Sequence, residues 1–255
     1  MTAEQMVSRL LYRDGLMLVI DKPAGLAVHQ GPPNGKDRGR ECLQDHFDTL
    51  RFGLPRPPSL AHRLDRDTSG CLVLGRHRKA LAQLGKLFKN GAIDKVYWAV
   101  VEGSPEVEEG TIELPLGRLD VTRGWWMKHD PNGQPAVTKW RVMGRTGSSA
   151  PATLAWLALE PLTGRTHQLR VHCAEMGWPI VGDAIYGTAP RTGGPIMHLH
   201  AREIVVPLYK NRDPIRVVAP VPEHMREPLI ACGWEGETDA PPQIVIPEAE
   251  PMGPR

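Results

Sequence analysis

Asp65 lies between Arg63 and Arg66 in the segment HRLDRDTSG, residues 62–70. A carboxylate within roughly 4–6 Å of a guanidinium stays ionised at neutral pH, and an ionised carboxylate in a cleft can attack an electrophilic carbon of a sugar or a base. The same spacing suits a structural aspartate that pairs with arginines around a turn. The residues alone therefore leave Asp65 open as a nucleophile or as a structural ion-pair partner.

A second carboxylate, Asp67, follows two residues after Asp65. Glycoside hydrolases use a pair of catalytic carboxylates. Asp65 and Asp67 could form such a pair, because residues two apart on a strand share one face. The acids of a glycosidase, however, straddle the scissile bond from separate elements, roughly 5–9.5 Å apart. A glycoside hydrolase would therefore need another acid that faces Asp65.

Hydrophobic spacing predicts the elements that hold this segment. We expect a strand, a tight turn at 67–70 and an apolar strand at 72–74. A helix is predicted over 78–91, where apolar residues recur at helical spacing and Gly91 can cap the end.

Two later segments supply further candidate residues. DKVYWAVVEG (94–103) is predicted to be a buried strand that carries Tyr97. THQLRVHCAEMG (166–177) is predicted to be a helix that carries Arg170 and ends at its last glycine. Taken alone, Tyr97 also fits a tyrosine that packs in the core, and Arg170 fits a surface arginine.

The rest of the chain supplies mostly strands. LLYRDGLMLVIDKPAG (10–25) is predicted to form two strands around a turn at Asp14-Gly15, and ECLQDHFDTL (41–50) a helix. Further strands are expected within 111–117, 136–143, 153–162, 197–206 and 215–221. The pattern predicts a mixed α/β (α+β) fold, a single domain built on a large, mostly antiparallel sheet flanked by a few helices.

Composition limits the class of protein. The 255 residues are 41% hydrophobic and 24% charged, which is typical of a globular protein. No segment approaches the ~20 apolar residues of a membrane span, and MTAEQMVSRL is too polar for a secretion signal. We expect a soluble cytoplasmic protein. Because no GxGxxG or P-loop pattern is present, no nucleotide cofactor is expected.

Charge is distributed unevenly along the chain. Residues 1–234 hold 30 basic and 24 acidic side chains, a net charge of +6, and residues 51–95 alone have a net charge of +7. Such an excess suits a polyanion such as nucleic acid, although it also fits a solvated basic face. The acidic, proline-rich residues 235–255 are predicted to be a disordered tail outside the domain at 1–234.

The cysteines and histidines do not match a metal or disulfide pattern. The four cysteines are far apart and form no CxxC pair, so we expect buried, reduced thiols. His167 and His172 are five residues apart, which does not match HExxH, whereas His198 and His200 would share a strand face. No third ligand stands at a suitable spacing beside either pair, so no metal is expected.

HRLDRDTSG (62–70) resembles the signature motif of the RluA family of pseudouridine synthases. LLYRDGLMLVIDKPAGLAVHQG (10–31) is similar to the opening motif of that family, and LTGRTHQLRVHCAEMGWPIVGDAIYG (162–187) to its closing motif. Between them, DKVYWAVVEG resembles the strand that carries the active-site tyrosine, and GQPAVTKWRV (133–142) a later strand. The similarity covers most of residues 9–222, with the motifs in the family's order.

The resemblance implies a role for each matching residue. Asp65 would be the nucleophile, Tyr97 would pack against the target uracil and help remove the proton from C5, and Arg170 would pair with the aspartate. Arg63 would help hold the nucleotide out of the RNA stack. His62 fits a structural hydrogen-bonding role better than a catalytic one. The full set of substrate-binding candidates is Arg63, Arg66, His62, Thr68, Arg165 and His167.

The resemblance also implies the partner. The substrate would be a uridine in structured RNA, either tRNA or large-subunit rRNA, and the protein would act as a monomer. The isomerisation needs no redox change and no energy input, so no cofactor is expected. Only about ten residues precede the opening motif, too few for an additional RNA-binding domain. RNA recognition would then come from the catalytic domain and from insertions at 31–40 and 123–134, where Trp125-Trp126 could stack on bases or anchor the loop.

Two alternative functions differ in chemistry. A non-catalytic RNA-binding protein that keeps this fold would be expected to have lost Asp65, Tyr97 or Arg170, and all three are present. A metal hydrolase would need a set of ligands that the spacing of the histidines does not provide.

Overall fold

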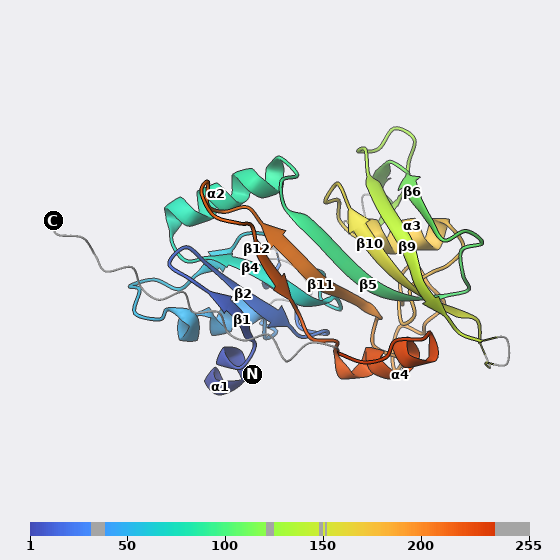
Figure 1. The fold of residues 1–255 in the computed structure, drawn as a ribbon, viewed down its shortest axis with the longest axis horizontal. Coiled ribbons are helices and arrows are strands. Elements are labelled where there is room, and N and C mark those ends of the chain that lie inside the picture. The colour runs from blue at the N-terminus through green and yellow to red at the C-terminus, as the bar shows by residue number, and fades with distance from the viewer. Residues whose placement is uncertain (32–38, 121–124, 148–149, 151, 238–255) are drawn as a thin grey trace.

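The computed structural model describes residues 1–31, 39–120, 125–147, 150 and 152–237. Within them a long, twisted sheet runs across the molecule with helices on both sides (Figure 1). The path of hydrogen-bonded neighbours is β1-β2-β4-β11-β5-β10-β9-β6, with β12 paired to β11 and β3 paired to β4. Only the β4–β11 pairing is parallel among the described strands. The predicted mixed α/β fold with a large, mostly antiparallel sheet is therefore confirmed.

The strands and helices match most of the predicted segments. The strands of the large sheet are β1 Leu10–Arg13, β2 Met17–Lys22, β3 Ser59–Leu60, β4 Ser69–Gly75, β5 Asp94–Glu102, β6 Glu109–Glu113, β9 Val137–Arg145, β10 Leu154–Pro161, β11 Leu199–Val206 and β12 Ile215–Val218. A small hairpin consists of β7 Leu116–Arg118 and β8 Met127–His129. The helices are α1 Ala3–Val7, α2 Arg78–Lys89, α3 Gln168–Glu175 and α4 Glu223–Ala231, and Leu43–Leu50 form a 3-10 helix.

The segment around Asp65 differs from its prediction. Residues 67–70 do not form a tight turn between two long strands, because β4 already begins at Ser69 and β3 has only two residues. The ladder between them stops where the ring of His62 accepts the backbone N–H of Val73 at 3.0 Å in place of a strand carbonyl. Residues 61–68 are therefore a loop, which carries Asp65 and leads into β4 within the sheet.

Alternation along β5 separates the two faces of the sheet. Ala99 and Val101 pack in a core with Leu169 and Cys173 of α3, whereas Val100 packs in another core, which also contains residues of α4. Successive side chains of a strand point to opposite faces, so α3 and α4 cover opposite sides of the same strands. Consequently, the odd-numbered residues of β5 face the side of the sheet where α3 lies.

Glycine is required where β4 meets β11. Gly70 has φ +101°, and a Cβ at this position would overlap the backbone of Ala201 on the neighbouring strand. Only glycine combines this backbone angle with so close an approach. The contact fixes the start of β4, and hence the end of the loop that carries Asp65.

Two predictions on the periphery need correction or completion. Glu237 falls in the predicted disordered tail, yet it pairs with Arg202 at 2.6 Å and accepts the N–H of Val221 at 2.7 Å, so the ordered chain extends past residue 234. Residues 238–255 lie outside the described part of the chain. The helix predicted over 166–177 is shorter in the structure, because α3 spans Gln168–Glu175, and Met176 just after it is 44% exposed. The four cysteines are buried and free, as predicted.

Candidate active site

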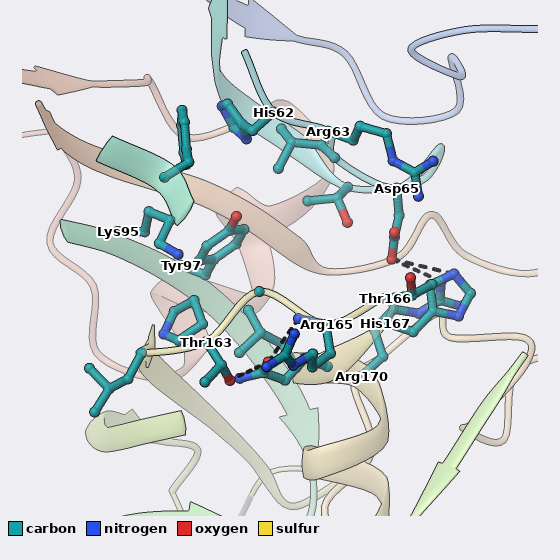
Figure 2. Close-up of a pocket in the computed structure, with 18 of the residues that line it drawn as sticks. His62, Arg63, Asp65, Lys95, Tyr97, Thr163, Arg165, Thr166, His167 and Arg170 are labelled. Carbon is teal, nitrogen blue, oxygen red and sulfur yellow. Dashed lines mark hydrogen bonds and ion pairs between the residues drawn. The ribbon is translucent and has the colours of Figure 1, made fainter. Parts of the chain in front are cut away.

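One pocket collects most of the predicted site residues. Its volume is about 590 Å³, and it is lined by the 62–68 loop, the end of α2, β5 and residues 161–170 (Figure 2). The predicted residues that line it are Asp65, Tyr97, Arg170, His62, Arg63, Thr68, Arg165 and His167. Residues far apart in the sequence therefore converge at one site.

Asp65 is held by a buried arginine. Nη1 of Arg170 donates to Oδ2 of Asp65 at 3.2 Å, while Nε and Nη2 of the same guanidinium donate to the two oxygens of Asp183 at 2.7 and 2.8 Å. The side chains of Arg170 and Asp183 are 5% and 1% exposed, and that of Asp65 is 28% exposed. The buried Arg170–Asp183 ion pair thus holds the Asp65 carboxylate in a fixed position in the pocket.

Burial and ion pairing act in opposite directions on these groups. Burial by itself disfavours the charged forms of Arg170 and Asp183. The hydrogen bonds and charges of Asp183 and Asp65 nevertheless raise the pKa of Arg170. The pKa of Asp183 is lowered by Arg170 and by the backbone N–H groups of Ile185 and Tyr186, which outweigh its burial. Both groups are therefore charged at neutral pH.

Lys22 holds the Asp65 loop through hydrogen bonds to its backbone. The end of β2 places its side chain in the interior, where the ammonium donates to the carbonyls of Pro23, Arg66 and Thr68 at 2.7–2.8 Å. Burial lowers the pKa of Lys22 to about 7. Three carbonyl acceptors use all three protons of an ammonium and leave no place for the lone pair of a neutral amine. These hydrogen bonds favour the charged form and fix the loop on both sides of Asp67.

Tyr97 lies in the pocket on the same face of β5 as α3. Burial, followed by the negative charge of Asp65, raises the pKa of its hydroxyl. The phenol is therefore protonated at neutral pH. Its ring gives the pocket an aromatic wall next to the carboxylate, which suits the stacking of a nucleobase.

His62 makes contacts with the backbone and with a neighbouring ring at one wall of the pocket. Besides accepting the Val73 N–H, its ring stacks on Phe88 at 4.6 Å between centroids. Burial lowers the pKa of His62 to about 3, so the ring is neutral. It closes one wall of the pocket and ends the β3–β4 ladder.

His167 lies against Asp65 in a left-handed backbone conformation. Its φ is 53°, unusual for a residue other than glycine, and its Nε2 is 3.7 Å from Oδ2 of Asp65. Tyr186 accepts the Met127 N–H and lies 2.8 Å from Nδ1 of His167, so the tyrosine donates to Nδ1 and the ring proton resides on Nε2. Burial lowers the pKa of His167 to about 4. A neutral ring thus directs an N–H toward the carboxylate.

The two tryptophans lie beside this histidine. The ring of Trp125 is 57% exposed and packs edge-on against His167 at 5.2 Å, whereas Trp126 stacks with the guanidinium of Arg191 at 4.5 Å. Trp125 is therefore a surface residue that packs against His167, one of the residues that line the Asp65 pocket. The neighbouring Arg123 and most of the insertion at 31–40 lie outside the described residues.

Arg66 is not brought into the pocket. Its Nε pairs with Asp67 at 3.1 Å, and the side chain lines a separate small cavity of about 260 Å³ with Gly25 and His29. Asp67 therefore has its own partner and does not line the pocket of Asp65. Within the described part of the chain, Asp65 is the one acid in that pocket, so the glycosidase interpretation lacks its second carboxylate.

Three further histidines have local partners. His200 hydrogen-bonds to the hydroxyl of Ser69 at 2.9 Å, His172 to that of Thr138 at 2.9 Å, and His198 to the carbonyl of Ile196 at 2.8 Å. No group of three or more His, Cys, Asp or Glu among the described residues is arranged to hold a metal ion. Likewise, no helix in the described ranges is long and apolar enough to cross a membrane.

Three residues that hold this site together, Lys22, Asp183 and Tyr186, are not among those predicted from the sequence. Asp183 and Tyr186 both belong to GDAIYG, inside the closing motif, and Lys22 belongs to DKPAG in the opening motif. The available signal was a charged residue inside a motif, but the burial of Lys22 and Asp183 is seen only in the folded chain.

Comparisons with known proteins agree with this architecture. The family described as RNA pseudouridylate synthase matches residues 16–175. An uncharacterised RNA pseudouridine synthase of Zymomonas mobilis is 40% identical over 220 residues, covering 86% of this chain and 95% of that protein. Ribosomal large subunit pseudouridine synthase D of Nitrosomonas europaea is 36% identical over 200 residues, covering 77% of this chain and 56% of that protein.

Solved structures show the same fold. Human RNA pseudouridylate synthase domain containing 4 superposes with a TM-score of 0.72 at 27% identity, covering 90% of this chain and 95% of that one. Human RNA pseudouridylate synthase domain containing 1 gives a TM-score of 0.71 at 28% identity, with 91% and 89% covered. The sequence motifs, the sheet and these relatives lead to one conclusion: the chain belongs to the RluA-type family of RNA pseudouridine synthases, which are isomerases.

Proposed function

We propose that this protein converts a specific uridine of structured RNA, in tRNA or large-subunit rRNA, to pseudouridine, with Asp65 as the nucleophile. The observation that carries the proposal is the hydrogen bond from buried Arg170 to the Asp65 carboxylate inside the pocket. Because Asp183 accepts hydrogen bonds from two nitrogens of the Arg170 guanidinium, Arg170 holds the Asp65 carboxylate in place before the substrate arrives. Electrostatic preorganisation of this kind is commonly the largest contribution to catalysis.

The reaction proceeds through a covalent ester. An oxygen of Asp65 bonds to C1′ of the ribose as the bond from C1′ to N1 breaks and its electron pair stays on the uracil. The free ring turns so that C5 faces C1′, and C5 then bonds to C1′ as the ester bond breaks and its electrons return to Asp65. C5 loses its proton and N1 gains one, so atoms, charge and oxidation state balance without a cofactor.

Tyr97 supports the ring and assists the final proton transfer. Because burial raises the pKa of its hydroxyl, the phenol does not act as a preformed phenolate base. It takes the proton from C5 as its own proton passes to the Asp65 carboxylate that has left C1′. Asp65 then releases that proton to water while N1 takes one from water, so both side chains return to their starting forms. The same ring stacks on the uracil, which returns roughly 1–3 kcal/mol of the few kcal/mol that unstacking a base costs.

Basic groups around the pocket bind the RNA backbone. Arg63 lies at the rim and contacts His29 at 3.3 Å, in position to hold the extruded nucleotide. Residues 51–95 supply a net charge of +7 for phosphate contacts. Among the relatives, the name of the Nitrosomonas europaea protein gives the large ribosomal subunit as its substrate, which supports rRNA as the first RNA to test.

The test compares the wild-type protein with Asp65→Ala on unmodified tRNA and rRNA transcripts. Nucleoside analysis is expected to show new pseudouridine with the wild type only, while RNA affinity of the variant stays within about threefold, because Asp65 makes its bond in the reaction rather than in binding. If both proteins bind RNA tightly and neither forms pseudouridine, the protein is a non-catalytic RNA-binding member of the fold. Pseudouridine formed by Asp65→Ala would refute Asp65 as the nucleophile.

A further inference from the structure

Lys95 is a pocket residue to which the proposed mechanism gives no task. It lies on β5 two residues before Tyr97, so the two side chains project on the same face of the strand. Both line the pocket. Figure 2 shows Lys95 beside Tyr97 and on the opposite side of the pocket from Asp65.

The Lys95 ammonium lacks a partner among the described residues, with no hydrogen bond or ion pair in the parts of the chain that the structure places. Asp65, the acid that lines the pocket, is held by Arg170, and the charge of the adjacent Asp94 only partly offsets the desolvation. Burial, followed by the charge of Lys95, lowers the pKa of the nearby His62, so that ring stays neutral and supplies no negative charge to the ammonium. Burial lowers the pKa of Lys95. Lys95 is partly buried, and a partly desolvated cation without a protein partner is unfavourable. A ligand that accepts hydrogen bonds would replace the hydration that the ammonium has lost.

We propose that Nζ of Lys95 donates a hydrogen bond to the carbonyl oxygen of the target uracil that lies farthest from the ribose. This proposal rests on the proposed function, because it needs a uracil on Tyr97 with C1′ at Asp65. With the ribose at Asp65, the ring extends across the pocket toward the opposite side, where Lys95 lies. The phosphates stay with the ribose at the Asp65 end, which favours the base over the backbone as the partner of Lys95.

The symmetry of uracil makes one donor sufficient for the whole reaction. In uridine the ribose is on N1, and the carbonyl across the ring is C4=O. Exchange of N1 for C5 corresponds to a half-turn about the axis through N3 and C6, which also exchanges C4=O for C2=O. The same ammonium therefore meets O4 before the ring turns and O2 afterwards. Lysine suits this task because its three protons rotate freely and it has no acceptor.

The same contact discriminates against cytosine. Position 4 of cytosine carries an amino group, which is a donor, so a donor-only ammonium would face another donor. A site that leaves such polar groups unpaired rejects the wrong ligand strongly. Lys95 would thus contribute to the choice of uracil as well as to its alignment.

The experiment uses an RNA stem-loop that spans the uridine modified by the wild-type protein. Single-turnover isomerisation and RNA affinity at several salt concentrations are measured for wild type, Lys95→Met and the control Lys139→Met, which removes an exposed lysine of β9. Lys95→Met is expected to slow isomerisation about 10- to 100-fold, the value of a hydrogen bond to a charged group. The salt dependence of its RNA affinity should match that of the control, because the contact is with an uncharged base and not with a phosphate.

Modified substrates test the exchange of carbonyls. Stem-loops with 2-thiouridine or 4-thiouridine at the target position replace either oxygen by sulfur, a weaker acceptor. Each is expected to slow the wild type about 3- to 10-fold and to leave Lys95→Met no slower than it is with uridine. Because these rates are measured on wild type as well, the test survives if Lys95→Met fails to fold.

The outcomes separate this proposal from the proposed function. A wild type that makes no pseudouridine refutes both. An active wild type with a normal rate for Lys95→Met refutes the Lys95 contact alone. Weaker RNA binding of Lys95→Met with a salt slope lower by about one unit would assign Lys95 to a phosphate and refute the contact with the base.

Discussion

Replacement of Asp183 by asparagine removes the charge that fixes Arg170, and through it Asp65. The asparagine oxygen can still accept from Nη2 of Arg170, but its amide group would face Nε, so one hydrogen bond at 2.7 Å becomes a contact between two donors. Arg170 is left buried with a weaker partner. Breaking a buried pair in this way costs about 3–5 kcal/mol of unfolding free energy.

The assay is thermal unfolding together with single-turnover isomerisation. A loss of about 3–5 kcal/mol lowers the midpoint of a chain of this size by about 6 to 20 °C. The isomerisation rate should fall about 100-fold as the carboxylate loses its alignment. The control Asp213→Asn removes an exposed carboxylate and should change the unfolding free energy by less than about 0.5 kcal/mol.

The effect of Asp183→Asn depends on pH in a defined direction. The pKa of Asp183 is lowered in the folded protein from its ordinary value of 3.8. The contribution of ionised Asp183 to the unfolding free energy is therefore complete above that ordinary value. It is lost as the pH falls through the pKa of Asp183 in the folded protein. The difference in midpoint between wild type and Asp183→Asn should narrow as the pH is lowered from about 5 to about 2.5.

A second substitution tests the physical cause. In Asp183→Asn combined with Arg170→Met, the uncompensated cation is gone, so the double variant should be more stable than Asp183→Asn alone. Additive losses in the double variant would refute the reasoning. So would a midpoint for Asp183→Asn within about 1 °C of wild type, since that is well below the loss expected for a broken buried pair.

Two more substitutions probe the elements around Asp65. Tyr97→Phe should fold and keep its stacking, with RNA affinity unchanged, but lose turnover because the proton relay is broken; normal turnover in a single-turnover assay would contradict the relay. Lys22→Met leaves three backbone carbonyls without their donor and should cost about 3 kcal/mol or more in urea-induced unfolding. Equal stability of Lys22→Met and wild type would show that water replaces the ammonium.

Local sequence determined the elements and part of the site. Apolar spacing gave the strands and α2, whose end at Lys89 is followed by Gly91 in the left-handed conformation that the sequence predicted. Alternation on β5 places Lys95 and Tyr97 on one face whatever the rest of the chain does. These features depend on neighbours in the chain, so the sequence suffices for them. The roles of Asp65, Tyr97 and Arg170 came from resemblance rather than from spacing.

Tertiary structure alone decided which charges meet. Asp65 and Arg170 are 105 residues apart and are joined because the order of strands brings the 61–68 loop next to the start of α3. Arg66 adjoins Asp65 in sequence but turns away to Asp67, since a loop gives side chains no fixed alternation. Packing likewise brings Asp183 to Arg170, where its carboxylate compensates the charge of the buried guanidinium. Long-range ion pairs follow from the arrangement of the sheet, which no local pattern encodes.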